Sequence, residues 1–272
     1  RMPSIAKPVF NAKVFRRLIA AFCTLFMASG ANAEGVEWTV APYLWAADVG
    51  VDLTINDDPA LGTTVPFKDL VDKLDGAFMA HAEVRSGRFG GLFDMIYIDL
   101  GDSSTTAVGP GGPILGDLVT DTRLKLQLYE LAGLVRLGQP DATRLKIDVL
   151  LGVRRTDLDI SVDIMLPGPG GNTILRRVDV SETDIFGGVR VVGLFNERWG
   201  YRVRADYGTG GTEGTVNLLT TAGYSFGQNG RFGIDVGYRY LKSEFKNAAG
   251  NSLNTETDIT MSGPVIGFVF KF

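Results

Sequence analysis

The sequence predicts an all-β fold, a closed antiparallel transmembrane β-barrel of about ten strands. Three observations support it. Segments of alternating apolar and polar residues recur along the chain, short turns alternate with long loops between them, and the closing segment has an uninterrupted apolar face. In that segment Ile266, Phe268, Phe270 and Phe272 lie on one side of an extended strand. An even number of strands closes a barrel without free edges, and eight or twelve strands remain compatible with the pattern.

The first 33 residues have the pattern of an export signal. Lys13, Arg16 and Arg17 precede an apolar run over 18–28, which is followed by small residues up to Ala33. A run of about 11 apolar residues is too short for a membrane-spanning helix, which needs roughly 20. We therefore expect cleavage after Ala33, and a single barrel domain over residues 34–272.

The charge of the chain excludes some partners. The formal charge is −4, and the five positive charges of the expected signal take the remainder to −9. Nucleic acid is not an expected partner, because binding it needs a basic surface. No later stretch has the 18 consecutive apolar residues of a helical membrane span. The single cysteine, Cys23, lies in the expected signal, so no disulfide is expected within the domain.

The expected strands form a regular series. Their connectors are short after the second, fourth, sixth and eighth strands and longer elsewhere, so both ends of the domain fall at the short-turn, periplasmic end. Aromatic residues gather there, as expected where a barrel meets lipid headgroups, and Tyr97, Tyr207 and Tyr240 are candidates for the opposite ring. The ten segments are 36–49, 77–86, 89–101, 123–137, 143–158, 183–195, 199–209, 215–226, 231–245 and 258–272.

Alternation along each strand separates a lipid face from a lumen face. Charged residues belong to the lumen, because a charge facing lipid at mid-depth costs about 2–4 kcal/mol. The expected lumen residues are Glu37, His81, Glu83, Arg85, Asp94, Glu130, Lys146, Asp148, Arg154, Arg190, Arg202, Arg204, Asp206, Asp235, Arg239 and Lys271. We also expect Lys271 to reach Asp235 and Glu37.

The fourth expected strand, 123–137, breaks the alternation. Leu124, Leu126 and Leu128 share one parity, whereas Leu131, Val135 and Leu137 share the other. A β-bulge near residues 128–130 would restore the phase.

The mature sequence resembles small Gram-negative outer-membrane β-barrel proteins of the porin-like and OmpA-like class. The resemblance rests on the export signal, the ten segments, their connectors and the closing run from Pro264 to Phe272. It implies a location in the outer membrane, contact with its lipid and lipopolysaccharide, and a monomeric state. It also implies that the barrel-assembly machinery binds the last strand, whose assembly signal would be Ile266, Phe268, Phe270 and Phe272.

Two interpretations of the lumen stay open. The charges either line a narrow passive channel for small polar solutes, or pair with one another and plug a barrel with a structural or surface-interaction role. The channel is the leading hypothesis. Arg190, Arg202 and Arg204 lie on neighbouring strands and would favour anions, unless Glu130 and Asp206 neutralise them.

His81 is the single histidine, and it raises a third, minor interpretation: an outer-membrane enzyme. If residues 87–88 form a two-residue turn, Asp94 lies directly opposite His81 on the next strand. In the outer-membrane enzymes of this class, the catalytic residues lie near the outer rim. His81, in contrast, is only about five residues from a periplasmic turn. We therefore interpret the pair as structural and expect no catalytic residues.

The first long connector contains an amphipathic segment. Phe67, Leu70, Val71 and Leu74 have helical spacing between Pro66 and Gly76, which predicts a short helix. The same connector is rich in aspartate but lacks the spacing of a calcium loop, so we expect no metal site and no cofactor.

Overall fold

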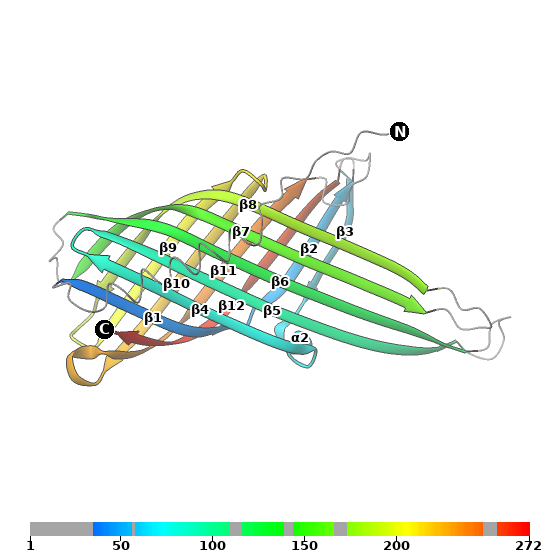
Figure 1. The fold of residues 1–272 in the computed structure, drawn as a ribbon, viewed down its shortest axis with the longest axis horizontal. Helices are drawn as coiled ribbons and strands as arrows, with labels where there is room; N and C mark the ends of the chain where they lie inside the picture. Colours follow the sequence, from blue (N-terminus) through cyan, green and yellow to red (C-terminus); the bar gives the residue numbers. More distant parts are fainter. Residues whose placement is uncertain (1–34, 56–57, 109–115, 139–143, 166–172, 247–254) are drawn as a thin grey trace. The chain divides into compact units, whose positions relative to one another are not determined.

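The structure is a computed structural model, and it describes residues 35–55, 58–108, 116–138, 144–165, 173–246 and 255–272. Residues 37–272 form one compact unit, whereas the expected export signal lies outside the described residues. That unit is a closed antiparallel barrel, as predicted (Figure 1). No helix in the described part of the chain is long and apolar enough to cross a membrane.

All ten expected segments are strands of the barrel wall. They are β1 (Val36–Trp45), β4 (Leu74–Ser86), β5 (Phe89–Val108), β6 (Gly116–Leu137), β7 (Leu145–Met165), β8 (Thr173–Leu194), β9 (Trp199–Thr209), β10 (Gly214–Phe226), β11 (Phe232–Lys246) and β12 (Thr255–Lys271). A hairpin of β2 (Asp48–Ile55) and β3 (Asp58–Val65), followed by α2 (Phe67–Val71), lies between β1 and β4 in sequence. A 3₁₀ turn, η1 (Gln228–Gly230), joins β10 to β11.

Two expectations for the long connectors are corrected. The sequence assigned 102–122 and 159–182 to loops, but β5, β6, β7 and β8 extend far into them. The first connector contains the β2–β3 hairpin, which sequence reasoning missed, and the predicted helix is shorter than expected.

The barrel closes in two stages along β12. β1 pairs with the short-turn half of β12, with Thr39 opposite Lys271 and Trp45 opposite Val265. Beyond residue 47, β2 takes over as the partner of β12, from Ser262 opposite Asp48 to Thr255. The sheet order ends at β3, so the described β3 has no strand partner other than β2. The wall is therefore closed towards the short turns and has an edge at the opposite, outer end.

A two-residue turn sets the register of β4 and β5. Ser86 lies opposite Phe89, and Gly87 has the positive φ of 55° that a glycine adopts readily. The same register places His81 opposite Asp94, as the sequence predicts.

The predicted bulge in β6 is wrong. β6 pairs with β5 and β7 without a register shift, and Leu126, Leu128, Glu130, Leu134 and Arg136 are all buried. The alternation is continuous. What changes along β6 is the chemistry of its inward face, which is apolar near the outer end and mixed towards the short turns, where Glu130 and Arg136 alternate with Ala132 and Leu134.

The outward face changes in the opposite sense. Near the short turns it is apolar, with Leu131 and Val135 exposed on β6. Towards the outer end the outward residues are Tyr129, Gln127 and Lys125. On β11, Tyr238 is followed on the same face by Lys242 and Glu244. The apolar band that faces lipid therefore ends near the level of Tyr129, and the barrel continues beyond it with a polar outside and an apolar inside.

The aromatic residues expected at the short turns are exposed there. Phe89, Phe195, Trp199, Phe226 and Phe232 all have exposed side chains. Ring pairs follow one another at this level, from the Phe195–Tyr201 pair at 5.0 Å, beside the connector between β8 and β9, to the Phe232–Phe270 pair at 6.0 Å between β11 and β12. This row fits a membrane interface.

The limit of the lipid band can be tested with two substitutions to arginine. Leu151 is 67% exposed in the middle of the apolar band, so Leu151→Arg should lower the free energy of unfolding in lipid bilayers by about 2–4 kcal/mol. Gln127→Arg, on the outward face beyond Tyr129, should change it by less than about 0.5 kcal/mol. Urea titration in vesicles measures both, and equal losses would contradict the assigned boundary.

Candidate functional site: the interior of the barrel

Glu130 is the centre of an ion-pair cluster that crosses the lumen. It is fully buried on β6 and accepts hydrogen bonds from arginines on three other strands. The donors are Arg154 Nε at 3.0 Å, Arg204 Nη2 at 2.8 Å and Arg239 Nη2 at 3.0 Å. Because β7, β9 and β11 lie at different positions around the wall, these bonds tie distant parts of the barrel together.

Two aspartates extend this cluster. Asp94 accepts from the Tyr43 hydroxyl at 2.8 Å and from Arg239 Nη1 at 3.3 Å. Asp206 accepts from Asn217 at 2.7 Å and pairs with Arg154 at 2.5 Å. We call the whole group the central cluster; it consists of Tyr43, Asp94, Glu130, Arg154, Arg204, Asp206, Asn217 and Arg239.

A second group lies closer to the short turns. Asp148 pairs with Arg85 at 3.0 Å, Arg136 at 3.0 Å and Arg190 at 2.8 Å. Glu83 pairs with Arg190 at 2.6 Å and with Arg85 at 3.1 Å. We call these five residues the periplasmic cluster. Buried ions are tolerated when they are paired and hydrogen-bonded in this way.

His81 joins the two clusters. Its Nδ1 lies 3.2 Å from Asp94 Oδ2, and its Nε2 lies 3.8 Å from Glu83 Oε2. The imidazole is thus held between one carboxylate of each cluster. His81 therefore links two groups of ion pairs. From the sequence, the His81–Asp94 pair was interpreted as structural.

The remaining expected lumen residues lie outside both clusters. Arg202 and Asp235 face each other at 3.8 Å and are partly exposed. Glu37 and Lys271 are exposed near the short-turn end, and Lys146 is half-buried there. Of the three arginines expected to form a basic patch, Arg190 and Arg204 are neutralised by carboxylates, as the sequence analysis allowed.

One of the two expected partners of Lys271, Asp235, is corrected by the structure. Asp235 lies opposite Gly267 on β12, and its ion pair is with Arg202. The backbone N–H of Lys271 instead donates to the carbonyl of Arg231, at 2.8 Å. The sequence-based pairing placed Lys271 about four residues too far along the strand.

Several interior residues were missed by sequence reasoning. Arg136 and Tyr43 have the same parity as the assigned lumen residues of their strands, so alternation alone could have found them. Asp184 on β8 has that parity as well. It accepts hydrogen bonds from the backbone N–H of Gly211 and from the Thr212 and Thr215 hydroxyls, which binds the connector between β9 and β10 inward. No sequence pattern predicts that fold-back.

Beyond the central cluster the lumen widens into an apolar cavity of about 560 Å³, which we call the outer cavity. Inward side chains such as Met79, Leu128, Leu158 and Met261 line it. None of its described lining residues is charged, and only Thr156 and Ser243 carry a hydroxyl group. Pockets that bind small molecules are typically about 300–1,000 Å³, mostly apolar, with few polar groups.

The outer cavity also reaches the lipid face of the wall. Its lining includes Leu44, Val236 and Ile266, which are 63%, 52% and 44% exposed on the outward side of β1, β11 and β12. Ala46, between β1 and β2, lines it as well. Residues of both the interior and the lipid-facing surface thus line the cavity near the point where β2 replaces β1 along β12.

Trp45 forms the boundary between the outer cavity and the central cluster. Its ring lies 5.1 Å from the guanidinium carbon of Arg239 and is buried, and it also lines the cavity. Its indole Nε1 has no hydrogen-bond partner among the described residues. An indole N–H is a donor only, so this buried group is left without an acceptor at the boundary.

The closed ladder and the apolar outer band decide the class of fold. The fold is that of an outer-membrane β-barrel.

No protein-family model matches the sequence, and no curated protein matches it significantly. Among solved structures, the outer-membrane protease OmpT from Escherichia coli has a TM-score of 0.44 at 8% identity, covering 87% of this chain and 96% of that chain. The translocator domain of autotransporter NalP from Neisseria meningitidis has 0.37 at 12%, covering 98% and 100%. Ail, the attachment invasion locus protein of Yersinia pestis, has 0.35 at 10%, covering 88% and 100%.

The contribution of the central cluster to the stability of the barrel can be measured by substituting Glu130. Glu130→Gln keeps the shape of the side chain but leaves three buried arginines short of one negative charge, and should lower the free energy of unfolding by about 3–5 kcal/mol. Glu244→Gln, which breaks an exposed pair with Lys242, should cost at most about 1 kcal/mol. Denaturant titration of both purified variants checks the difference, and similar small losses would show that the lumen charges do not hold the barrel together.

Proposed function

We propose that this barrel binds a small apolar molecule in the outer cavity and takes it up from the surrounding membrane. The observation that carries the proposal is one uncharged cavity of about 560 Å³, lined by residues of both the interior and the lipid face. Bringing an ion or a strongly polar solute into such a lining costs several kcal/mol, because no partner replaces its water. The suitable ligand is an acyl chain or a hydrocarbon-like molecule.

The polarity of the outer part of the barrel supports a binding role. Beyond the lipid band the outward residues are polar and the inward ones apolar, as in a water-exposed barrel that holds an apolar ligand. The single free donor at the boundary, Trp45 Nε1, suits one acceptor atom on the ligand, such as a carbonyl or hydroxyl oxygen. We therefore favour a molecule with an apolar body and at most one or two polar atoms.

The passive channel for polar solutes, the leading hypothesis from the sequence, is less well supported. Glu130 joins β6 to three other strands across the lumen, and Asp94 and Asp206 add further pairs. Hydrated solutes would have to separate these buried pairs, and breaking one such pair costs about 3–5 kcal/mol. The plugged lumen, the alternative weighed from the sequence, agrees better with this geometry.

Binding is tested by filling the outer cavity. Ala47 is buried and lines it, so Ala47→Phe should weaken binding of cis-parinaric acid, a fluorescent fatty acid, by at least about tenfold. Energy transfer from Trp45 reports binding, in a background where Trp38 and Trp199 are replaced by phenylalanine. Ala205→Phe, an identical change on the lipid face of β9, is the matched control and should leave affinity unchanged.

Two results would count against this function. One is equal affinity in Ala47→Phe and Ala205→Phe, which would place the fatty acid outside the cavity. The other is steady single-channel conductance of the wild-type barrel in planar bilayers, which would favour the channel for polar solutes instead.

The route from the membrane is tested at the neighbouring residue. Ala46 is half-buried and lines the lipid-side part of the cavity, so Ala46→Phe should narrow the opening. Uptake of the fatty acid from vesicle membranes, followed by stopped-flow fluorescence, should slow by about tenfold while the equilibrium affinity stays within about twofold. An unchanged uptake rate, with Ala205→Phe as the control, would mean that the ligand enters from the outer end.

A further inference from the structure

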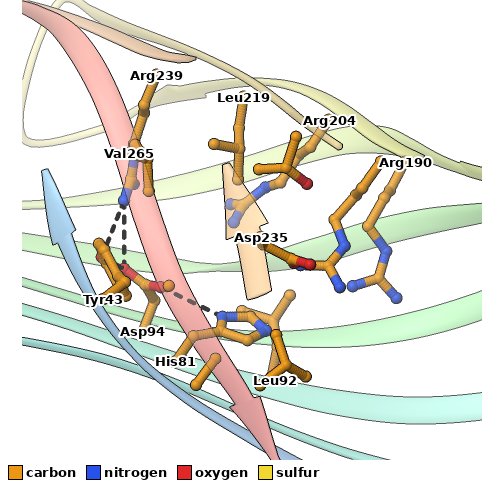
Figure 2. A pocket seen from close by; sticks show the side chains of 15 residues that line it. Tyr43, His81, Leu92, Asp94, Arg190, Arg204, Leu219, Asp235, Arg239 and Val265 are labelled. Atoms are coloured by element: carbon orange, nitrogen blue, oxygen red, sulfur yellow. Dashed lines mark hydrogen bonds and ion pairs between the residues drawn. The ribbon is translucent and has the colours of Figure 1, made fainter. Parts of the chain in front are cut away.

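A second, smaller cavity of about 60 Å³ lies in the lumen at the level of the ion pairs, and we call it the lower cavity (Figure 2). Side chains of both clusters line it, including Arg190 and Arg204, together with His81 and the Arg202–Asp235 pair. Figure 2 shows His81 across the cavity from Arg204 and Asp235. The lower cavity is separate from the outer cavity, and its lining is rich in cations.

Three polar atoms of this lining have no hydrogen-bond partner among the described residues. They are His81 Nε2, Arg202 Nε and Arg204 Nε, and all three atoms are buried. Arg204 Nε lies 2.7 Å from Asp206 Oδ2, but the two are not aligned as a hydrogen bond. Arg202 Nε and Arg204 Nε are donors, and a buried donor without a partner costs about 1–3 kcal/mol, so an acceptor for these two groups is expected in the cavity itself.

Among the residues that line the lower cavity, arginines outnumber carboxylates, with four arginines against Asp94 and Asp235. The ion pairs of the described lumen involve seven arginines and six carboxylates, with His81 taken as neutral. The arginines are Arg85, Arg136, Arg154, Arg190, Arg202, Arg204 and Arg239, and the carboxylates are Glu83, Asp94, Glu130, Asp148, Asp206 and Asp235. Asp184, a seventh carboxylate and itself buried, lies opposite Arg154 in the ladder between β7 and β8, so seven carboxylates match the seven arginines and the excess of cations is confined to the lining of the cavity.

We propose that the lower cavity binds one small monovalent inorganic anion, of the size of a halide or nitrate, between Arg202 and Arg204. Such an anion accepts hydrogen bonds from the unpartnered guanidinium groups, in a lining where arginines outnumber carboxylates. A cavity of about 60 Å³ has room for a few water-sized atoms, which excludes phosphate esters and organic acids of any length.

Asp235 is the group that competes with the anion. Its carboxylate is 3.8 Å from Arg202 Nη1, longer than the other carboxylate–arginine pairs of the lumen, and both side chains are about a quarter exposed. Arg202 is therefore the least neutralised arginine of the network and lies on the side of the cavity that solvent reaches. This site is independent of the apolar ligand proposed for the outer cavity.

Two substitutions with opposite expected effects test the anion site. Arg202→Gln removes a charge from the cavity and should weaken bromide binding by at least about tenfold, whereas Asp235→Asn removes the competing carboxylate and should strengthen it by about tenfold. Thermal unfolding of the folded barrel in detergent, at constant ionic strength with bromide replacing gluconate, gives the apparent dissociation constants. Lys242→Gln makes the same change outside the lumen and should have no effect.

The location is tested directly by anomalous diffraction from crystals grown in bromide. An anomalous peak within hydrogen-bond distance of Arg202 Nε and Arg204 Nε, together with the opposite shifts in solution, would establish the site. A lower cavity that contains only water, or equal effects of Arg202→Gln and Asp235→Asn on bromide binding, would overturn the proposal. So would a peak without any anion-specific stabilisation in solution.

Discussion

The structure depends on one constraint, which is that no backbone N–H or C=O group within hydrocarbon is left without a partner. The pairing of β1 with β12 meets this constraint by closing the wall at the level of the lipid band. Towards the outer end the constraint is weaker because water replaces lipid. There β2 takes over from β1 and β3 ends the sheet order. The change of partner along β12 thus separates a strictly closed part of the barrel from a part whose wall has an edge.

The same boundary accounts for the reversal of polarity across the wall. In lipid the outside must be apolar, so polar groups are confined to the lumen, where Glu130 and Asp148 neutralise the arginines. In water the outside is polar, and Leu126 and Leu128 turn inward to the outer cavity. One uninterrupted strand, β6, serves both environments, with the same alternation and opposite chemistry. The ion-pair clusters and the outer cavity are two consequences of one change in solvent.

The sequence predicts the part of the fold that alternation and turns control. All ten strands, the two-residue turn at Gly87 and the position of His81 opposite Asp94 follow from local patterns. The β2–β3 hairpin does not, because its pairing with β12 joins residues about two hundred positions apart in sequence. The supposed bulge in β6 is the most informative error. Leucines of lumen parity were attributed to a shift of phase, on the assumption that every inward residue is polar, when they are the lining of an apolar cavity.

The candidate site, too, is only partly predictable from the sequence. Alternation finds the charges of the lumen, but not which of them meet, since Glu130 contacts Arg154, Arg204 and Arg239 across the barrel rather than along one strand pair. It also cannot find a cavity, which depends on the volumes of side chains from many strands. The unpartnered atoms of Trp45 and Arg202 become visible only when every neighbour is placed.

The order of the outer cavity, Trp45 and the central cluster along the lumen limits where the proposed ligand can move. A molecule in the outer cavity meets Trp45 and then Arg239, and beyond them lies the central cluster. To continue towards the short turns, an apolar molecule would have to replace buried ion pairs without offering them any partner, at a cost of several kcal/mol for each. The proposed lateral route at Ala46 avoids this cost, because it leads from one apolar environment to another. The geometry therefore supports reversible exchange of the ligand between the membrane and the outer cavity rather than passage through the barrel.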